Sequence, residues 1–104
     1  MKDKSDSAIW SELKAGEREA LRVLFERYYN ELLQYAVKLS YNRSLAKDCV
    51  QELFYRIWDR RTFLGDITSV KAYLWVSLRR DLFKAMSRDE KHFEPEDYLS
   101  LMKC

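Results

Sequence analysis

Apolar residues recur at three- and four-residue steps along most of the chain, the spacing at which side chains share one face of an α-helix. The longest such run starts near residue 17 and predicts a helix of about six turns. Its apolar positions are Ala20, Leu21, Leu24, Phe25, Tyr28, Leu32, Ala36 and Leu39. A shorter run through Ile9, Trp10 and Leu13 predicts a first helix that is capped by Ser7 and ended by Gly16.

Two further helices are predicted beyond a polar break at residues 40–44. Ser44 is the expected cap of the third helix, which should end near Arg61. Its apolar side consists of Ala46, Val50, Leu53 and Ile57. After a short connector, Thr68 or Ser69 is expected to cap a fourth helix that ends within residues 87–91. Its apolar stripe consists of Val70, Leu74, Leu78, Leu82 and Ala85.

The pattern therefore predicts an all-α fold, a compact bundle of about four helices, in one domain at residues 1–91. Residues 92–104, which include the single proline, are expected to be the start of an acidic linker or the tail of a shortened chain. The composition agrees with this fold. Two glycines and one proline in 104 residues are too few for the turns of a sandwich or barrel. A hydrophobic content of 47% excludes disorder for most of the chain.

What the chain lacks limits its location and its chemistry. No apolar stretch approaches the roughly twenty residues that span a bilayer, so we expect no membrane insertion. Cys49 and Cys104 do not make a disulfide framework, which favours a reducing, cytoplasmic compartment. The single histidine, His92, lies in the polar tail, so we expect neither a His-centred triad nor a zinc site with several His or Cys ligands. We therefore expect no enzymatic activity, no metal and no cofactor.

Basic residues are concentrated in one part of the chain. Residues 55–88 hold eight basic and three acidic side chains, a net +5, so the rest of the chain carries −3 against a total of +2. A solvated helix face is the commoner meaning of such a cluster, and a site for a polyanion is the functional one. Charge alone does not decide between them.

The polar side of the third predicted helix contains a run that is typical of a known family. Residues 48–54 read Asp-Cys-Val-Gln-Glu-Leu-Phe, and Trp58 follows one turn later. This segment resembles region two of bacterial sigma factors of the extracytoplasmic-function (ECF) group. In that family an Asp-x-Val-Gln-Glu-x-Phe run lies on the helix that docks against a coiled coil of the RNA polymerase β′ subunit. The resemblance implies a polymerase-binding set of Asp48, Gln51, Glu52, Tyr55, Arg56 and Asp59.

The resemblance covers residues 9–88 in the order of the family. Residues 20–35 look like the family's first long helix, and residues 70–79 look like the helix that faces the promoter −10 element. Lys47 replaces a usual acid and Arg80 stands where many relatives have Asn, so inherited base preferences are not carried over. Known members add a helix-turn-helix domain for the −35 element, which implies that this chain is part of a longer protein. The resemblance also implies an anti-sigma factor as a partner.

Candidate DNA contacts lie on the fourth predicted helix and on the connector before it. Basic side chains off the apolar stripe can face phosphates. The rings of Tyr73, Trp75 and Phe83 are either core or a stacking platform for unpaired bases. Residues 64–69 stand where ECF relatives carry a loop that captures an extruded base. The predicted DNA-binding set is Arg60, Arg61, Gly65, Asp66, Thr68, Ser69, Lys71, Tyr73, Trp75, Arg79, Arg80 and Lys84.

The resulting hypothesis is a transcription initiation factor domain. It would bind core RNA polymerase, engage the non-template strand of the −10 element and help to melt it. Two other classes stay open: a free-standing helical interaction module that uses only the third helix, and a general basic protein that binds duplex DNA of any sequence. Affinity for single-stranded −10 DNA distinguishes the three.

Overall fold

The computed structural model describes residues 4–91, and the side chains of residues 4–88. The linker predicted at residues 92–104 lies outside the described residues. The described part forms four α-helices and no strand: α1 (Asp6–Lys14), α2 (Arg18–Ser40), α3 (Arg43–Asp59) and α4 (Val70–Lys91). A short 3₁₀ turn, η1 (Arg61–Phe63), follows α3. The prediction of an all-α fold with about four helices is confirmed.

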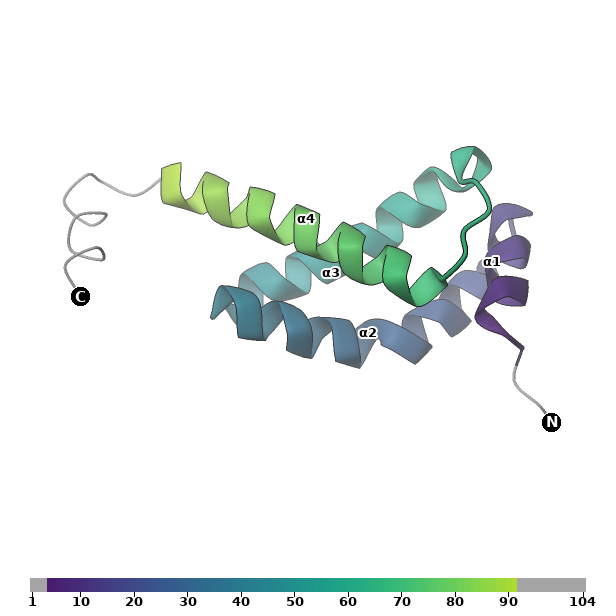
Figure 1. Cartoon of the computed structure of the whole chain (residues 1–104), viewed down its shortest axis with the longest axis horizontal. Helices are drawn as coiled ribbons and strands as arrows, with labels where there is room; N and C mark the ends of the chain where they lie inside the picture. Colours follow the sequence, from purple (N-terminus) through teal and green to yellow (C-terminus); the bar gives the residue numbers. More distant parts are fainter. Residues whose placement is uncertain (1–3, 92–104) are drawn as a thin grey trace.

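The helices pack as a bundle in which α4 lies across α2 and α3 (Figure 1). α2 and α3 pack on each other and are joined by a short turn at Tyr41 and Asn42. α1 lies at the end of the bundle where α3 ends and α4 begins, beside the connector at residues 64–69. The fold therefore brings α1 and this connector together although they are far apart in the sequence.

Two of the predicted helix caps are wrong by two residues. Ser5, not Ser7, caps α1, and its Oγ accepts a hydrogen bond from the Ala8 amide at 3.1 Å. Asn42, not Ser44, caps α3, and its side chain accepts from the Leu45 amide at 3.0 Å. In both cases an earlier cap-competent side chain reaches a first-turn amide, so the later serine becomes part of the helix.

The start of α4 is predicted more accurately than the end of α3. Ser69 caps α4 as expected, because its Oγ accepts a hydrogen bond from the Ala72 amide at 3.1 Å. At the other end α3 stops at Asp59, before the expected end near Arg61, and the chain tightens into η1. Helices often finish in such a 3₁₀ turn, which satisfies carbonyls that the helix leaves open.

The apolar faces of the four helices meet in one core. The stripe of α4 is fully enclosed at Leu74, Leu78 and Leu82, which are each 0% exposed. The other core residues are Ile9, Trp10, Leu13, Ala20, Leu24, Leu32, Leu33, Ala36, Ala46, Cys49, Val50, Leu53, Phe54, Ile57 and Val70. Cys49 is free, and burial raises the pKa of its thiol, as expected for a small core residue. The predicted stripes therefore face inward, although Ala85 of α4 and four predicted α2 positions are only half-buried: Leu21, Phe25, Tyr28 and Leu39.

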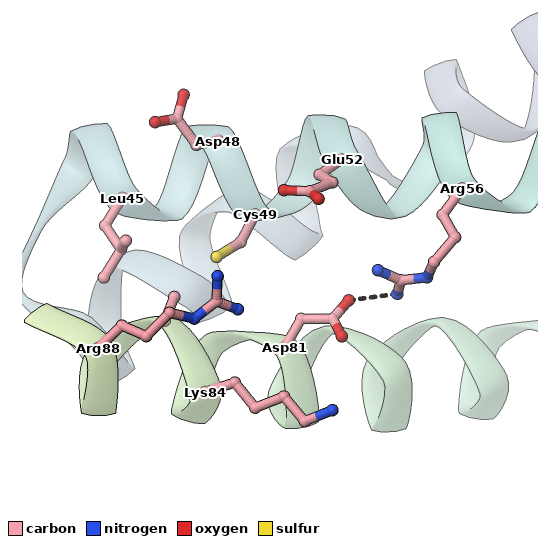
Figure 2. Close-up of a pocket in the computed structure, with 9 residues that line it drawn as sticks. Leu45, Asp48, Cys49, Glu52, Arg56, Asp81, Lys84 and Arg88 are labelled. Atoms are coloured by element: carbon pink, nitrogen blue, oxygen red, sulfur yellow. Dashed lines mark hydrogen bonds and ion pairs between the residues drawn. The ribbon is translucent and has the colours of Figure 1, made fainter.

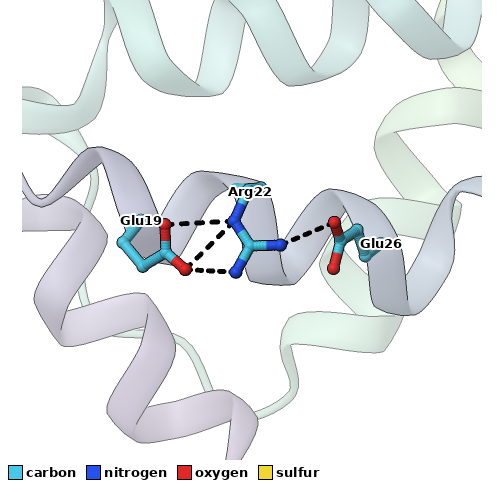
Figure 3. Close-up of polar contacts among 3 residues, drawn as sticks. All are labelled: Glu19, Arg22 and Glu26. Carbon is cyan, nitrogen blue, oxygen red and sulfur yellow. Dashed lines mark hydrogen bonds and ion pairs between the residues drawn. The ribbon is translucent and has the colours of Figure 1, made fainter.

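An exposed ion-pair chain lies on the outer side of α2 (Figure 3). Arg22 pairs with Glu19 one turn before it and with Glu26 one turn after it, with its Nη1 at 2.6 Å from Glu26 Oε1. These hydrogen bonds lower the pKa of Glu19 and raise that of Arg22. Pairs at this spacing support the helix locally, but solvent and salt screen them. We therefore assign them a role in α2 and none in binding.

Gly16 sits in a turn that requires a residue without a side chain. Its φ is +95°, and its amide bonds the Leu13 carbonyl while the Glu17 amide bonds the Glu12 carbonyl, both at 3.0 Å. This is the Schellman arrangement that ends many helices. The turn fixes the angle between α1 and α2.

Gly16→Ala is expected to destabilise the domain by about 1–2 kcal/mol, because an L side chain in this left-handed conformation is strained. A Cβ at Gly16 would meet no atom closer than Arg61 Nε at 3.9 Å, so the cost lies in the backbone. Gly65→Ala is the matched control, since Gly65 has open space and no positive φ. Urea unfolding followed by circular dichroism measures both, and equal stabilities would contradict the described turn.

Candidate functional site

The outer side of α3 presents a continuous polar surface. It consists of Asp48, Gln51, Glu52, Tyr55 and Asp59, all exposed, and we call it the α3 face. Tyr55 is 69% exposed although it is a large ring. The opposite side of the same helix is the buried stripe that begins at Ala46. The helical period therefore separates an exposed polar face from the core, as the sequence pattern predicts.

Arg56 departs from the other predicted docking residues. Its side chain is half-buried and forms an ion pair from Nη2 to Asp81 Oδ2 on α4 (Figure 2). The pair joins α3 to α4. Arg56 therefore already has a partner inside the domain.

A pocket lies between α3 and α4 beside the α3 face (Figure 2). Carboxylates of Asp48 and Glu52 line it from α3, and the cations of Lys84 and Arg88 line it from α4. Leu45, Cys49, Arg56, Asp81 and Ala85 complete the lining. Lys84, which the sequence predicts to contact DNA, thus lines the same pocket as two carboxylates that it predicts to bind polymerase.

Other predicted DNA residues occupy the flank of α4 that faces α2. Lys71 Nζ lies 3.9 Å from Glu31 Oε2 of α2 and 5.4 Å from the ring centre of Trp75. Trp75 is half-buried, with its ring 5.9 Å from Tyr28 and 6.4 Å from Tyr35. Lys71 and Lys84 are therefore on opposite flanks of one helix.

Three of the remaining side chains of α4 are on its outer side, those of Arg79, Arg80 and Phe83. Arg79 and Arg80 are exposed, and the guanidinium of Arg79 lies 5.4 Å from the ring centre of Phe83. Phe83 is itself 47% exposed. Tyr73 is half-buried and meets Trp10 edge-on at 5.3 Å. Of the three rings considered for stacking, Phe83 is thus the open one and the other two are partly core.

Two arginines follow the last residue of α3. Arg60 is exposed and is the C-cap residue. Arg61 is half-buried, donates from Nη1 to the Trp58 carbonyl at 2.8 Å and lies 4.1 Å above the Trp58 ring. Arg61 therefore holds the turn after α3, whereas Arg60 is open to a phosphate.

The connector exposes four predicted DNA residues, Gly65, Asp66, Thr68 and Ser69. The carbonyl of Gly65 accepts a hydrogen bond from Trp10 Nε1 at 3.1 Å. Asp66 accepts from Lys14 Nζ at 2.8 Å, and this bond together with the lysine charge lowers the pKa of that carboxyl.

Sequence reasoning missed Trp10 and Lys14 as neighbours of the connector. A signal for Trp10 exists, because a buried indole N–H needs an acceptor. Nothing in the sequence singles out Lys14.

Residues 4–91 lack two kinds of functional feature. This part of the chain brings together no group of three or more His, Cys, Asp or Glu side chains able to hold a metal ion. None of its helices is both long and apolar enough to cross a membrane.

Comparison with known protein families identifies a match that includes these surfaces. The family model described as sigma-70 region 2 matches residues 24–99, which is more than half of the chain and includes α3, the connector and α4. No curated protein and no solved structure matched. The exposed α3 face and the basic α4 thus fall inside the matched segment. The chain belongs to the sigma-70 region 2 family, the sigma-factor region involved in binding core RNA polymerase and recognising the promoter −10 element.

Proposed function

We propose that this domain is region two of an ECF sigma factor. It docks on the β′ coiled coil of core RNA polymerase through the α3 face, and it engages the non-template strand of the −10 element through α4 and the connector. The family match supports a sigma-factor region of this kind. The ECF subgroup and an anti-sigma partner rest on the resemblance of residues 9–88 and stay predictions.

The observation that carries the docking proposal is the composition of the α3 face. Three exposed carboxylates, from Asp48, Glu52 and Asp59, share this face with the exposed ring of Tyr55. Aromatic residues supply much of the affinity of protein interfaces, and charges around them steer the partner and fix its register. An α3 face of this kind fits a partner that presents basic side chains beside an apolar patch.

A pull-down tests this docking directly. The chain is expected to retain core RNA polymerase and also the isolated β′ coiled coil. Retention of neither would remove the docking half of the proposal.

The DNA proposal divides the work between two surfaces. Exposed cations of α4, above all Arg79 and Arg80, neutralise phosphates and set the register of the strand. The connector reads a base that has left its stack, because only groups that line a pocket distinguish one extruded base from another. Lys84, in the pocket beside Glu52, belongs in this view to the docking side.

Arg79→Ala is expected to weaken binding of single-stranded DNA about equally for all sequences. Loss of one phosphate contact should reduce the slope of log affinity against log salt by about 0.7. Lys84→Ala is the matched control, for which we expect an unchanged slope. Fluorescence anisotropy over a salt series measures both variants. An unchanged slope for Arg79→Ala would show that this arginine does not contact a phosphate of the bound strand.

A further inference from the structure

We propose that α1 is a positioning element for the connector, and that Trp10 and Lys14 thereby set how strictly the domain discriminates among promoter bases. This inference rests on the proposed function. Neither residue is assigned to DNA, and α1 lies before the first residue of the family match, Leu24. The proposal therefore concerns an element that the family match does not describe.

Trp10 holds the connector by its backbone. The residue is 3% exposed, and its indole N–H donates to the Gly65 carbonyl across 55 positions of the chain. Carbonyl groups in a loop lack the regular hydrogen-bond partners that a helix provides. The bond from Trp10 therefore fixes the backbone at the one glycine of the connector. Leaving a buried N–H donor without an acceptor costs free energy, so this hydrogen bond is maintained in the folded domain.

The same ring also orders the start of α4. Trp10 meets Tyr73 edge-on, with ring centres 5.3 Å apart and planes at 63°. Edge-to-face pairs of this kind are a preferred aromatic geometry. Trp10 thus sets the connector and the first turn of α4 relative to each other.

Lys14 adds an ionic contact one turn further along α1. Its Nζ lies 2.8 Å from Asp66 Oδ1, and this hydrogen bond together with the lysine charge lowers the pKa of that carboxyl. The Asp66 side chain is 98% exposed, so the pair adds little to stability. Its effect is to restrict where the carboxylate points.

α1 is rigid enough to act as such a support. Leu13 is fully buried, and Asp6 binds Arg27 of α2 at 2.8 Å and accepts a hydrogen bond from the Tyr28 hydroxyl. The Gly16 turn fixes the other end of α1. Both ends of the helix are therefore tied to α2 independently of the connector.

The test selects binders from a pool of single-stranded DNA oligonucleotides with a randomised central segment. Wild type is compared with Trp10→Phe, which keeps a ring but loses the N–H donor, with Lys14→Met, and with the double variant. Tyr28→Phe is the control, because it removes one α1–α2 hydrogen bond, leaves the Asp6–Arg27 ion pair that also holds α1, and does not involve the connector. Lys14→Arg keeps the ion pair. Binding to the β′ coiled coil and hydrogen exchange of the connector amides are measured in parallel.

We expect the double variant to lose about tenfold in the affinity ratio of the selected strand to a scrambled strand, equivalent to about 1.4 kcal/mol. Its connector amides should exchange faster with solvent, while its binding to the β′ coiled coil stays at the wild-type level. Tyr28→Phe and Lys14→Arg should keep the wild-type affinity ratio and the wild-type exchange rates. Lys14→Met, at a partly exposed position, keeps the test valid if the tryptophan variants do not fold. An unchanged ratio in Lys14→Met and in every folded Trp10 variant overturns the inference and leaves the proposed function intact. A wild-type protein without any base preference overturns both.

Discussion

Glu52→Lys is expected to abolish binding to the β′ coiled coil while the domain stays folded. Glu52 is exposed at the centre of the α3 face, so its replacement disturbs no core packing. A lysine there would repel a basic partner and would also stand beside Lys84 and Arg88 in the pocket. Like charges forced together at an interface cost several kcal/mol, so we expect a loss of affinity of at least about 100-fold.

The matched control for this variant is Glu26→Lys. Glu26 is an exposed glutamate of α2 that pairs with Arg22, away from the α3 face (Figure 3). The same charge reversal there should leave β′ binding unchanged. Circular dichroism establishes that both variants fold, and a pull-down reports binding. A well-folded Glu52→Lys domain that binds like wild type would remove the α3 face as the docking surface.

Leu78→Ala is expected to cost about 2–5 kcal/mol of the free energy of unfolding. Leu78 is 0% exposed in the middle of the α4 stripe, where α4 lies across α2 and α3 (Figure 1). Its truncation removes buried methyl groups and leaves a cavity. Because a domain of this size is only marginally stable, the melting temperature should fall by about 10 °C or more.

Val76→Ala, two residues before Leu78, supplies the control. Val76 is 56% exposed on α4, so the loss of its methyl groups should change stability by less than about 0.5 kcal/mol. Thermal and urea unfolding measure both variants. If the two substitutions lower the free energy of unfolding equally, the buried and exposed sides of α4 are misassigned. The exposed position of Arg79 would then be wrong as well.

The helices and their inward faces are predictable from the sequence because they depend on local periodicity. The stripe from Val70 to Leu82 is buried as its spacing predicts, and so is the apolar side of α3. Helix ends are less predictable, because several cap-competent side chains compete within a few residues. Asn42 outcompetes Ser44, since the α2–α3 turn puts Asn42 first in reach of an open amide.

The α3 face is predictable for the same local reason, whereas contacts between distant segments are not. Periodicity identifies the basic side chains of α4 as outward-facing, but it does not say which flank meets α2 and which meets α3. Only packing places Lys71 near Glu31 and Lys84 near Glu52. The bond from Trp10 to Gly65 likewise depends on how α1 folds back on the end of the bundle.

The proposed function requires that this domain recognise unpaired promoter DNA. Fluorescence anisotropy with three probes tests it most directly: the non-template strand of a −10-like sequence, its duplex, and a scrambled single strand. We expect the tightest binding to the −10 strand, and weaker binding both to the scrambled strand and to the duplex. Equal affinity for all three, as for a general basic DNA-binding protein, or no binding to any, as for a helical interaction module, would contradict the proposed function.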